Sequence, residues 1–311
     1  MGHHPTSVWL GFSLLVAGLL FLDLGVLNRR AHILTFKEAM SWSLGLIAIA
    51  LLFGLFVIWR EGAQAGLEYY TGYLIELSLS VDNLFVFILI FQYFSVPAEA
   101  QPKVLKWGIL GAIVMRFLMI ALGALLLERF HWIVYVFGGI LVITGVRMFT
   151  QQEAHIEPER NPIVRLARRI LPFTSAYDGT RFFCRNVAGK RFATPLLLVL
   201  IVVEWSDLVF AIDSIPAIFA ITRDPFLVYS SNVFAILGLR ALFFVLAGMM
   251  DKFVYLKPGV AIILVFVGVK MLASQWVKIP TALSLLIILM ILAAAVALSL
   301  RRTAREARLP A

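Results

Sequence analysis

Acidic residues interrupt two otherwise apolar stretches of the sequence. Residues 204–222 read EWSDLVFAIDSIPAIFAIT, and residues 76–91 read ELSLSVDNLFVFILIF. In each stretch an aspartate is followed directly by a small side chain that carries an oxygen atom, Asn83 or Ser214. Such oxygen ligands suit Mn²⁺, Ca²⁺ or Mg²⁺, and the lack of His and Cys nearby disfavours Zn²⁺ and Cu⁺. The candidate metal ligands are therefore Asp82, Glu204, Asp207, Asp213, Glu76, Asn83 and Ser214.

The charge balance of the apolar stretches also favours a cation. An ionised side chain at the centre of a membrane helix costs at least ~2.5–3.5 kcal/mol unless it is paired. Five acids face three intramembrane cations, Arg116, Arg240 and Lys270, which leaves an excess of two negative charges. Bound metal, protons or both can neutralise this excess, and their competition for the same carboxylates is a basis for proton coupling. Purely structural ion pairing is the alternative interpretation, and an anionic substrate is disfavoured.

The composition is that of an all-α polytopic membrane protein. Of the 311 residues, 61% are hydrophobic and 14% are charged, whereas soluble domains have about 45–50% apolar and about 25% charged residues. The single cysteine, Cys184, excludes an intramolecular disulfide. We interpret the net charge of +9 as topology signals on cytoplasmic loops beside the lipid bilayer rather than as a nucleic-acid surface.

Nine apolar runs are long enough to predict membrane-spanning helices, each needing about 20 residues. They are 8–27, 41–59, 67–93, 104–127, 132–150, 194–221, 227–250, 255–274 and 280–300. Lys and Arg concentrate in 28–40, 151–193 and 301–311, so we expect the N-terminus outside and the C-terminus in the cytoplasm. The long loop 151–193 contains a basic amphipathic helix at 161–173, which we expect on the inner leaflet.

The two acidic stretches belong to an internal repeat. Aligning Asp82 with Asp213 places Glu76 on Asp207, and the tails GVRMF (145–149) and GVKML (268–272) also match. Each copy has three spans, so the second copy enters the membrane from the opposite side. We therefore predict one transporter domain over 1–311 with inverted repeats at 67–150 and 194–274, an architecture whose substrate site lies at the midplane between the repeats.

Helical geometry adds two expectations about individual residues. Glu204 and Asp207 share a helix face, whereas Asp213 points about 120° away from Asp207 on an ideal helix. Pro216 predicts a break near 212–216 that lets both aspartates face one site. Asp23 lies near the cytoplasmic end of the first span, where we expect it to reach water or pair with Arg29 or Arg30.

The sequence resembles the TerC family, in particular its Alx-like branch. The resemblance is carried by LSLSVDNLFVF (77–87), GKRFATPLLLVLIVVEWSDLVFAIDSIPAIFAIT (189–222) and SSNVFAILGLRALFF (230–244), and it extends over nearly the whole chain. It implies a manganese exporter of the inner membrane, with Asp82, Glu204, Asp207 and Asp213 as its acidic positions. Glu76 enters the site through the repeat alignment.

Three function classes remain to be compared. The first is a secondary transporter that exports a divalent cation in exchange for protons, with Mn²⁺ as the expected cargo and Ca²⁺ or Mg²⁺ as alternatives. The second is a membrane scaffold or assembly factor that transports nothing. An enzyme is not expected, because the sequence has no HExxH or GxSxG motif and hence no predicted catalytic or cofactor-binding residues.

Overall fold

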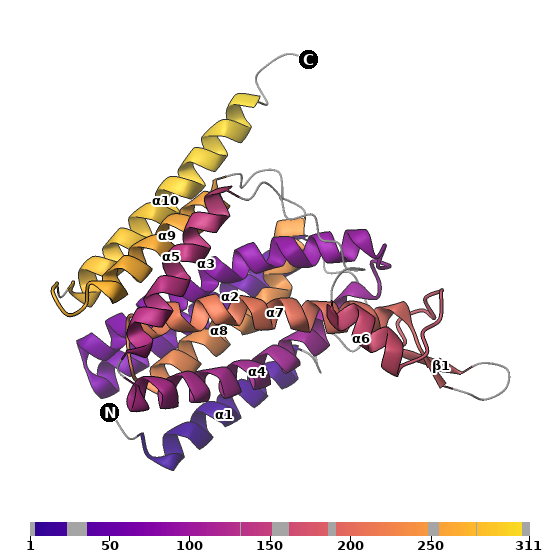
Figure 1. Cartoon of the computed structure of the whole chain (residues 1–311), viewed down its shortest axis with the longest axis horizontal. Helices are drawn as coiled ribbons and strands as arrows, with labels where there is room; N and C mark the ends of the chain where they lie inside the picture. Colours follow the sequence, from indigo (N-terminus) through magenta and orange to yellow (C-terminus); the bar gives the residue numbers. More distant parts are fainter. Residues whose placement is uncertain are drawn as a thin grey trace.

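The chain folds into a bundle of long helices with one small β-hairpin (Figure 1). The computed structural model describes residues 4–23, 36–130, 132–150, 162–185, 191–247, 255–277 and 279–306. Its elements are α1 (Thr6–Phe21), α2 (Phe36–Glu61), α3 (Ala63–Tyr93), α4 (Gln101–Arg129), α5 (Ile133–Thr150), α6 (Pro162–Ile170), β1 (Phe183–Arg185), β2 (Arg191–Ala193), α7 (Pro195–Phe219), α8 (Pro225–Ala247), α9 (Leu256–Leu272) and α10 (Thr281–Glu306). A helix is therefore present at each of the nine predicted spans.

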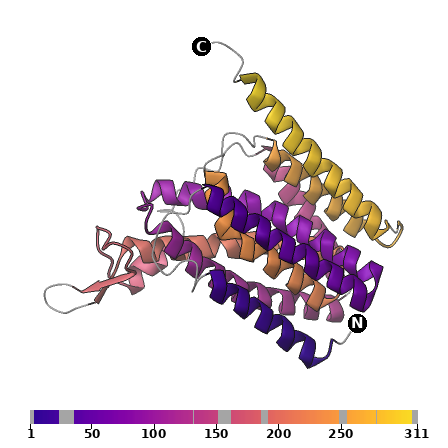
Figure 2. The same cartoon turned by 180° about the vertical axis from the view of Figure 1, so that it is seen from behind.

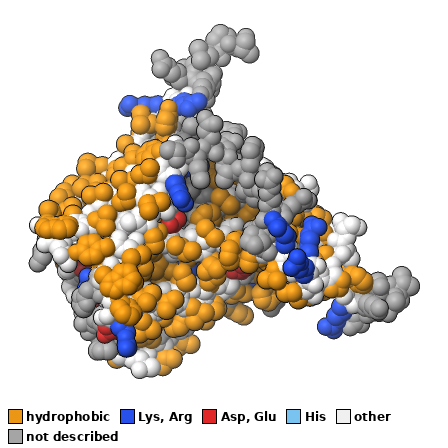
Figure 3. Space-filling view, in the orientation of Figure 1, with side chains coloured by type: hydrophobic (Ala, Val, Ile, Leu, Met, Phe, Trp, Pro, Cys, Tyr) orange, Lys and Arg blue, Asp and Glu red, His pale blue; other side chains and the backbone are white. Residues whose placement is uncertain are grey.

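The helices have the length and surface of a multi-pass membrane protein. Among the described residues, six helices are long and apolar enough to cross a membrane: α2, α3, α4, α7, α8 and α10. Large hydrophobic side chains such as Leu14, Leu118 and Trp59 are exposed on α1, α4 and α2, and hydrophobic residues cover most of the visible helical surface (Figure 3). A soluble protein rarely exposes so large a continuous apolar area, so we assign the chain as an all-α integral membrane protein. That all nine helices span the bilayer stays a prediction.

Helices α3, α4, α7 and α8 surround the residues of the candidate site. Helix α8 is the most enclosed of the six long helices, and it packs against α2, α3 and α4. Helix α7 contacts α3 and α4, so acids on α3 and α7 can reach the same basic residue on α4. Helix α10 packs outside, along α9 and α3.

Helices α5 and α9 pack against each other over much of their length, and their crossing is built on glycine. A Cβ atom on Gly268 would lie 2.9 Å from the carbonyl oxygen of Gly138, and one on Gly145 would lie 2.8 Å from that of Ala261. The predicted repeat alignment pairs Gly145 with Gly268 and Gly138 with Ala261, so it exchanges these two contacts. This exchange is what a two-fold axis between α5 and α9 requires, while the full inverted repeat stays a prediction.

The predicted helix break at Pro216 is wrong. Helix α7 runs without interruption from Pro195 to Phe219 with Pro216 inside it, and the Ala220 N–H donates to the Pro216 carbonyl at 3.0 Å. The proline removes one backbone donor, but neighbouring helices bury this part of α7 and tolerate the loss. Asp207 and Asp213 therefore stay on an unbroken helix.

The segment 151–193 holds more structure than one amphipathic helix. The predicted helix is present as α6, which packs against α7; its predicted place on the inner leaflet stays a prediction. Beyond α6, strands β1 and β2 form an antiparallel hairpin that pairs Cys184 with Phe192, and this hairpin projects from one end of the helical bundle in both views (Figures 1 and 2). The sequence analysis did not predict the hairpin. Residues 151–161 and 186–190 lie outside the described part of the chain.

Replacing Gly268 with alanine is expected to destabilise the α5–α9 crossing. The added methyl group would meet the Gly138 oxygen and the Leu141 side chain, each at 2.9 Å, and overpacking of this kind costs about 1–3 kcal/mol. The matched control is Gly139→Ala, because a Cβ at Gly139 meets nothing within 4 Å. Thermal unfolding of the purified protein in detergent should show a lower midpoint for Gly268→Ala alone. Equal midpoints would contradict the close crossing.

Candidate functional site

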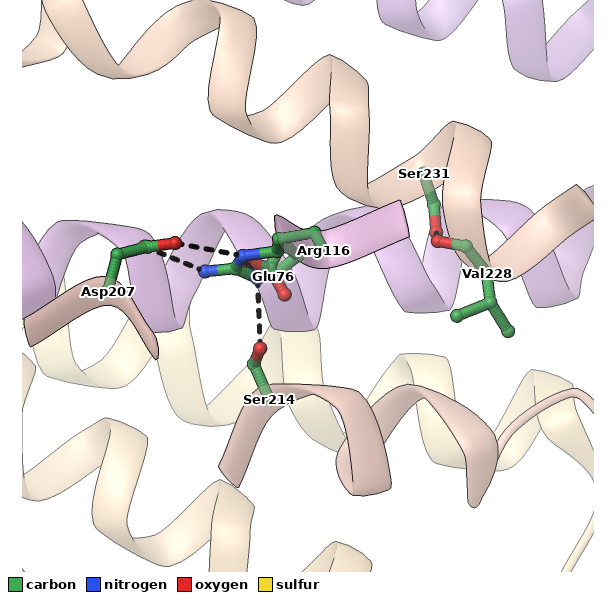
Figure 4. Close-up of polar contacts among 6 residues, drawn as sticks. All are labelled: Glu76, Arg116, Asp207, Ser214, Val228 and Ser231. Carbon is green, nitrogen blue, oxygen red and sulfur yellow. Dashed lines mark hydrogen bonds and ion pairs between the residues drawn. The ribbon is translucent and has the colours of Figure 1, made fainter. Parts of the chain in front are cut away.

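The guanidinium of Arg116 lies fully buried between acids from two other helices. Its Nη2 atom lies 3.1 Å and its Nε atom 3.4 Å from the two carboxylate oxygens of Asp207 on α7. Its Nη1 atom donates to Glu76 on α3 and, at 2.9 Å, to the hydroxyl of Ser214 on α7 (Figure 4). One arginine on α4 thus joins three of the predicted site residues.

These contacts bring together the two acids that the repeat alignment made equivalent. Glu76 and Asp207 both lie near the middle of their helices, and both bond to the same guanidinium. One positive charge faces two carboxylates, so the group is one charge short of neutrality. In addition, the second carboxylate oxygen of Glu76 has no hydrogen-bond partner among the described residues. When both carboxylates are ionised, the group therefore carries one net negative charge in a region of low dielectric constant.

A third acid, Glu204, extends the site on the side of Asp207. Glu204 and Asp207 line one small cavity between α3, α4, α7 and α8, together with apolar residues such as Phe87 and Leu239. This confirms that the two acids share a face of α7. Glu204 makes no hydrogen bond or ion pair with any described residue, and it lies against Gly111, where a Cβ would be 2.1 Å from its Oε1 atom. A side chain at position 111 would displace this carboxylate from its present place.

Asp213 lies apart from these acids. Its carboxylate is half-buried and accepts a hydrogen bond from the Thr144 hydroxyl of α5 at 2.8 Å, so the expectation that Asp207 and Asp213 face one site is wrong. The reason is the continuity of α7, which keeps the two side chains on different faces. The position of the Asp82 side chain lies outside what the structure describes, whereas Asn83 is buried with its Nδ2 atom lacking a partner in the described part of the chain.

The seven predicted ligands therefore fall into separate groups. Within the described residues, no three His, Cys, Asp or Glu side chains are arranged to hold a metal ion. Arg116 gathers Glu76, Asp207 and Ser214, while Glu204 shares a cavity with Asp207. Arg240 of α8 lines the same cavity, and the carboxylate of Glu204 forms no hydrogen bond or ion pair with a described residue.

Asp23 belongs to a buried contact that sequence reasoning missed. It is only 4% exposed, and it accepts hydrogen bonds from Arg240 Nη2 on α8 at 2.5 Å and from Trp42 Nε1 on α2 at 2.6 Å. The expectation that Asp23 reaches water is therefore wrong; Arg29 and Arg30, its other expected partners, lie outside the described residues. The sequence signals for this contact were one acid, Asp23, in the apolar run 8–27 and one arginine, Arg240, in the run 227–250.

This contact changes the charge count of the site. Arg240 is bonded to Asp23, and Lys270 donates to the Ser284 hydroxyl at 2.9 Å. Of these three cations, Arg116 is the one that bonds to predicted site acids within the described part of the chain. Glu76, Asp207 and Glu204 against Arg116 leave an excess of two negative charges when all three acids are ionised.

Fold and site together define a multi-pass, all-α integral membrane protein with carboxylates buried at the middle of its helices. The model of the integral membrane protein TerC family matches residues 61–307. The chain belongs to the TerC family.

Similar proteins support this assignment over most of the chain. An uncharacterized membrane protein of Myxococcus xanthus is 52% identical over 294 residues, which cover 94% of this chain and 92% of that protein. The putative membrane-bound redox modulator Alx of Escherichia coli strain K12 is 49% identical over 287 residues, 89% of each chain. An uncharacterized membrane protein of Rickettsia felis is 41% identical over 284 residues, 91% of this chain and 94% of that protein. No solved structure matches the chain.

Replacing Arg116 with glutamine is expected to destabilise the bundle by about 3–5 kcal/mol, because it leaves two buried carboxylates without their cation. The matched control is Arg181→Gln, since Arg181 is 74% exposed and pairs with Asp178 at 3.5 Å, an interaction worth about 0–1 kcal/mol. Thermal unfolding in detergent measures both. Adding Glu76→Gln and Asp207→Asn to Arg116→Gln should recover most of the loss. Equal stability of the two single variants would show that the ion pairs of Arg116 do not stabilise the bundle.

Proposed function

We propose that the chain is a secondary transporter that exports a divalent metal cation, with Mn²⁺ as the cargo, in exchange for protons. The observation that carries the proposal is Glu204, a carboxylate without a bonding partner among the described residues, in a cavity that it shares with Asp207. Acids within membrane helices are costly and typically mark ion or proton pathways. A cation in this cavity would contact both carboxylates.

The charge around the cavity favours a divalent ion. Arg116 offsets one of the two negative charges on Glu76 and Asp207, so ionisation of Glu204 leaves the group with two uncompensated charges. Either one divalent cation or two protons can restore neutrality. Because metal ligands must be deprotonated, metal and protons compete for the same carboxylates, which is the physical basis for an exchange of the two.

The size of the cavity bears on metal selectivity. Its volume is about 20 Å³, enough for roughly one water-sized particle. A cation must therefore shed most of its hydration shell to enter. Mg²⁺ gives up its water reluctantly, so the cavity disfavours Mg²⁺ relative to Mn²⁺ and Ca²⁺.

The predicted ligands Asp82, Asn83, Asp213 and Ser214 would serve the same transport in other ways. Ser214 supports the site through Arg116, and Asp213 lies farther along α7, on the way to its extracytoplasmic end in the predicted topology. Asp82 is the repeat equivalent of Asp213, and we propose it as an acid of the opposite half of the path. The proposed orientation has the N-terminus outside and the C-terminus in the cytoplasm of the cell that carries this protein in its inner membrane.

The name of the Escherichia coli relative, a putative membrane-bound redox modulator, suggests a different activity. This chain has one cysteine, and Cys184 lies half-buried in β1, so a dithiol–disulfide cycle within one chain is excluded. A scaffold or assembly factor without transport is the remaining alternative, and a flux measurement on purified protein separates it from the transporter.

Replacing Glu204 with glutamine is expected to reduce Mn²⁺ transport by at least about tenfold, since even indirect partners of a bound metal contribute 10–100-fold. The measurement is Mn²⁺ uptake into proteoliposomes, with and without a pH gradient, alongside Ca²⁺ and Mg²⁺. Glu128→Gln is the matched control, because Glu128 is exposed near the end of α4.

Wild-type flux that responds to the pH gradient, together with loss of flux in Glu204→Gln, would support the proposal. Normal flux in Glu204→Gln would disprove the site. Absence of flux in the wild type with every metal would instead favour the scaffold. Asp82→Ala, Asp207→Ala and Asp213→Ala extend the series, and normal transport by all three would remove these residues from the pathway.

A further inference from the structure

We propose that Arg240 is a tethered counter-cation of the cavity: it bonds to Asp23 while the transported cation is bound and turns to Glu204 and Asp207 when that cation leaves. The inference rests on the proposed cation site and adds a residue that replaces the cargo in the empty carrier.

Arg240 is placed between two sets of acids. Its side chain lines the cavity together with Glu204 and Asp207, while its Nη2 atom donates to Asp23 at 2.5 Å. The arginine is 3% exposed, and its Nε atom has no hydrogen-bond partner among the described residues. A buried guanidinium with an unsatisfied donor gains from a further acceptor, and the carboxylate without a partner in the same cavity is that of Glu204.

Asp23 can release Arg240 without being left unpaired. Trp42 Nε1 donates to its Oδ1 atom at 2.6 Å, and this bond comes from α2, so it does not depend on α8. Asp23 lies outside both predicted repeats, at the end of α1. Asp23 therefore serves as a fixed acceptor that keeps the Arg240 guanidinium from bonding to Glu204 and Asp207 while the cargo is bound.

Arg116 shows how an arginine can bond to acids of both predicted repeats, as we propose for Arg240 in the empty carrier. Arg116 and Arg240 occupy similar places in the two predicted repeats, 29 and 28 residues before the shared glycines Gly145 and Gly268. Arg116 bonds to Glu76 and Asp207, whereas Arg240 bonds to Asp23. An arginine at this position can therefore bridge the acids of the repeats, and α1 supplies the acid that diverts the second one.

The consequence for transport is electrostatic. When the cavity loses its cation, Glu204 and Asp207 are left with uncompensated charge in a region of low dielectric constant, which opposes movement of the empty carrier. Arg240 can neutralise that charge by a rotation of its side chain, with its backbone still in α8. An arriving divalent cation repels the guanidinium, which returns to Asp23.

The first experiment needs no metal. Asp23→Asn should force Arg240 onto Glu204, so the pair of substitutions Asp23→Asn and Glu204→Gln should lower the thermal unfolding midpoint by more than the sum of the single changes. The matched control uses Asp178→Asn in place of Asp23→Asn, because the exposed Asp178 contacts Arg181 on the surface. Strictly additive midpoints would overturn the inference, whether or not the chain transports cations.

The second experiment is a titration of the purified full-length protein with MnCl₂. Asp23→Asn should weaken Mn²⁺ binding by roughly tenfold or more, on the scale of one added charge–charge repulsion at close range. Asp23→Asn combined with Arg240→Gln should restore the affinity, because the competing cation is gone. Trp42→Phe, which keeps the ring but removes the N–H donor, should shift the affinity in the direction of Asp23→Asn.

The outcomes separate this inference from the proposed function. If wild type and Arg240→Gln bind Mn²⁺ but the double variant is as weak as Asp23→Asn, Asp23 has only a structural role and the inference fails. If the wild type shows no saturable binding at all, the proposed cation site fails and the inference falls with it.

Discussion

The guanidinium of Arg116 is the point on which the site depends. It holds α3 and α7 to α4 through Glu76 and Asp207, so acids from both halves of the chain meet at one guanidinium. The same positioning of α7 against α4 presses Glu204 onto Gly111 and forms the cavity with Asp207. Since two carboxylates share one cation, the contact organises the site and leaves one net negative charge when both acids are ionised.

Much of the helical framework was predictable from the sequence, because lipid leaves few choices. A long apolar run must satisfy its backbone groups internally, and a helix does so; the structure has a helix at each predicted span. The shared face of Glu204 and Asp207 followed from their spacing on one helix. The repeat alignment placed Glu76 and Asp207 at equivalent positions, and both bond to Arg116 in the structure, while the repeat itself stays a prediction.

The remaining features depend on packing between distant helices, which spacing along one helix cannot give. Asp23 and Arg240 are 217 residues apart, and neither carries a local motif that names its partner. Pro216 suggested a break because proline disrupts isolated helices, but burial among neighbouring helices keeps α7 continuous. As a result Asp213 bonds to Thr144 instead of joining Asp207.

The central claim is that a cation occupies the cavity between Glu204 and Asp207. Crystals of the full chain grown with MnCl₂ and measured at the manganese absorption edge test it most directly. The account predicts an anomalous peak in direct contact with the Glu204 carboxylate, which disappears in crystals of Glu204→Gln. A peak located only elsewhere, or one that persists at this position in Glu204→Gln, would contradict it.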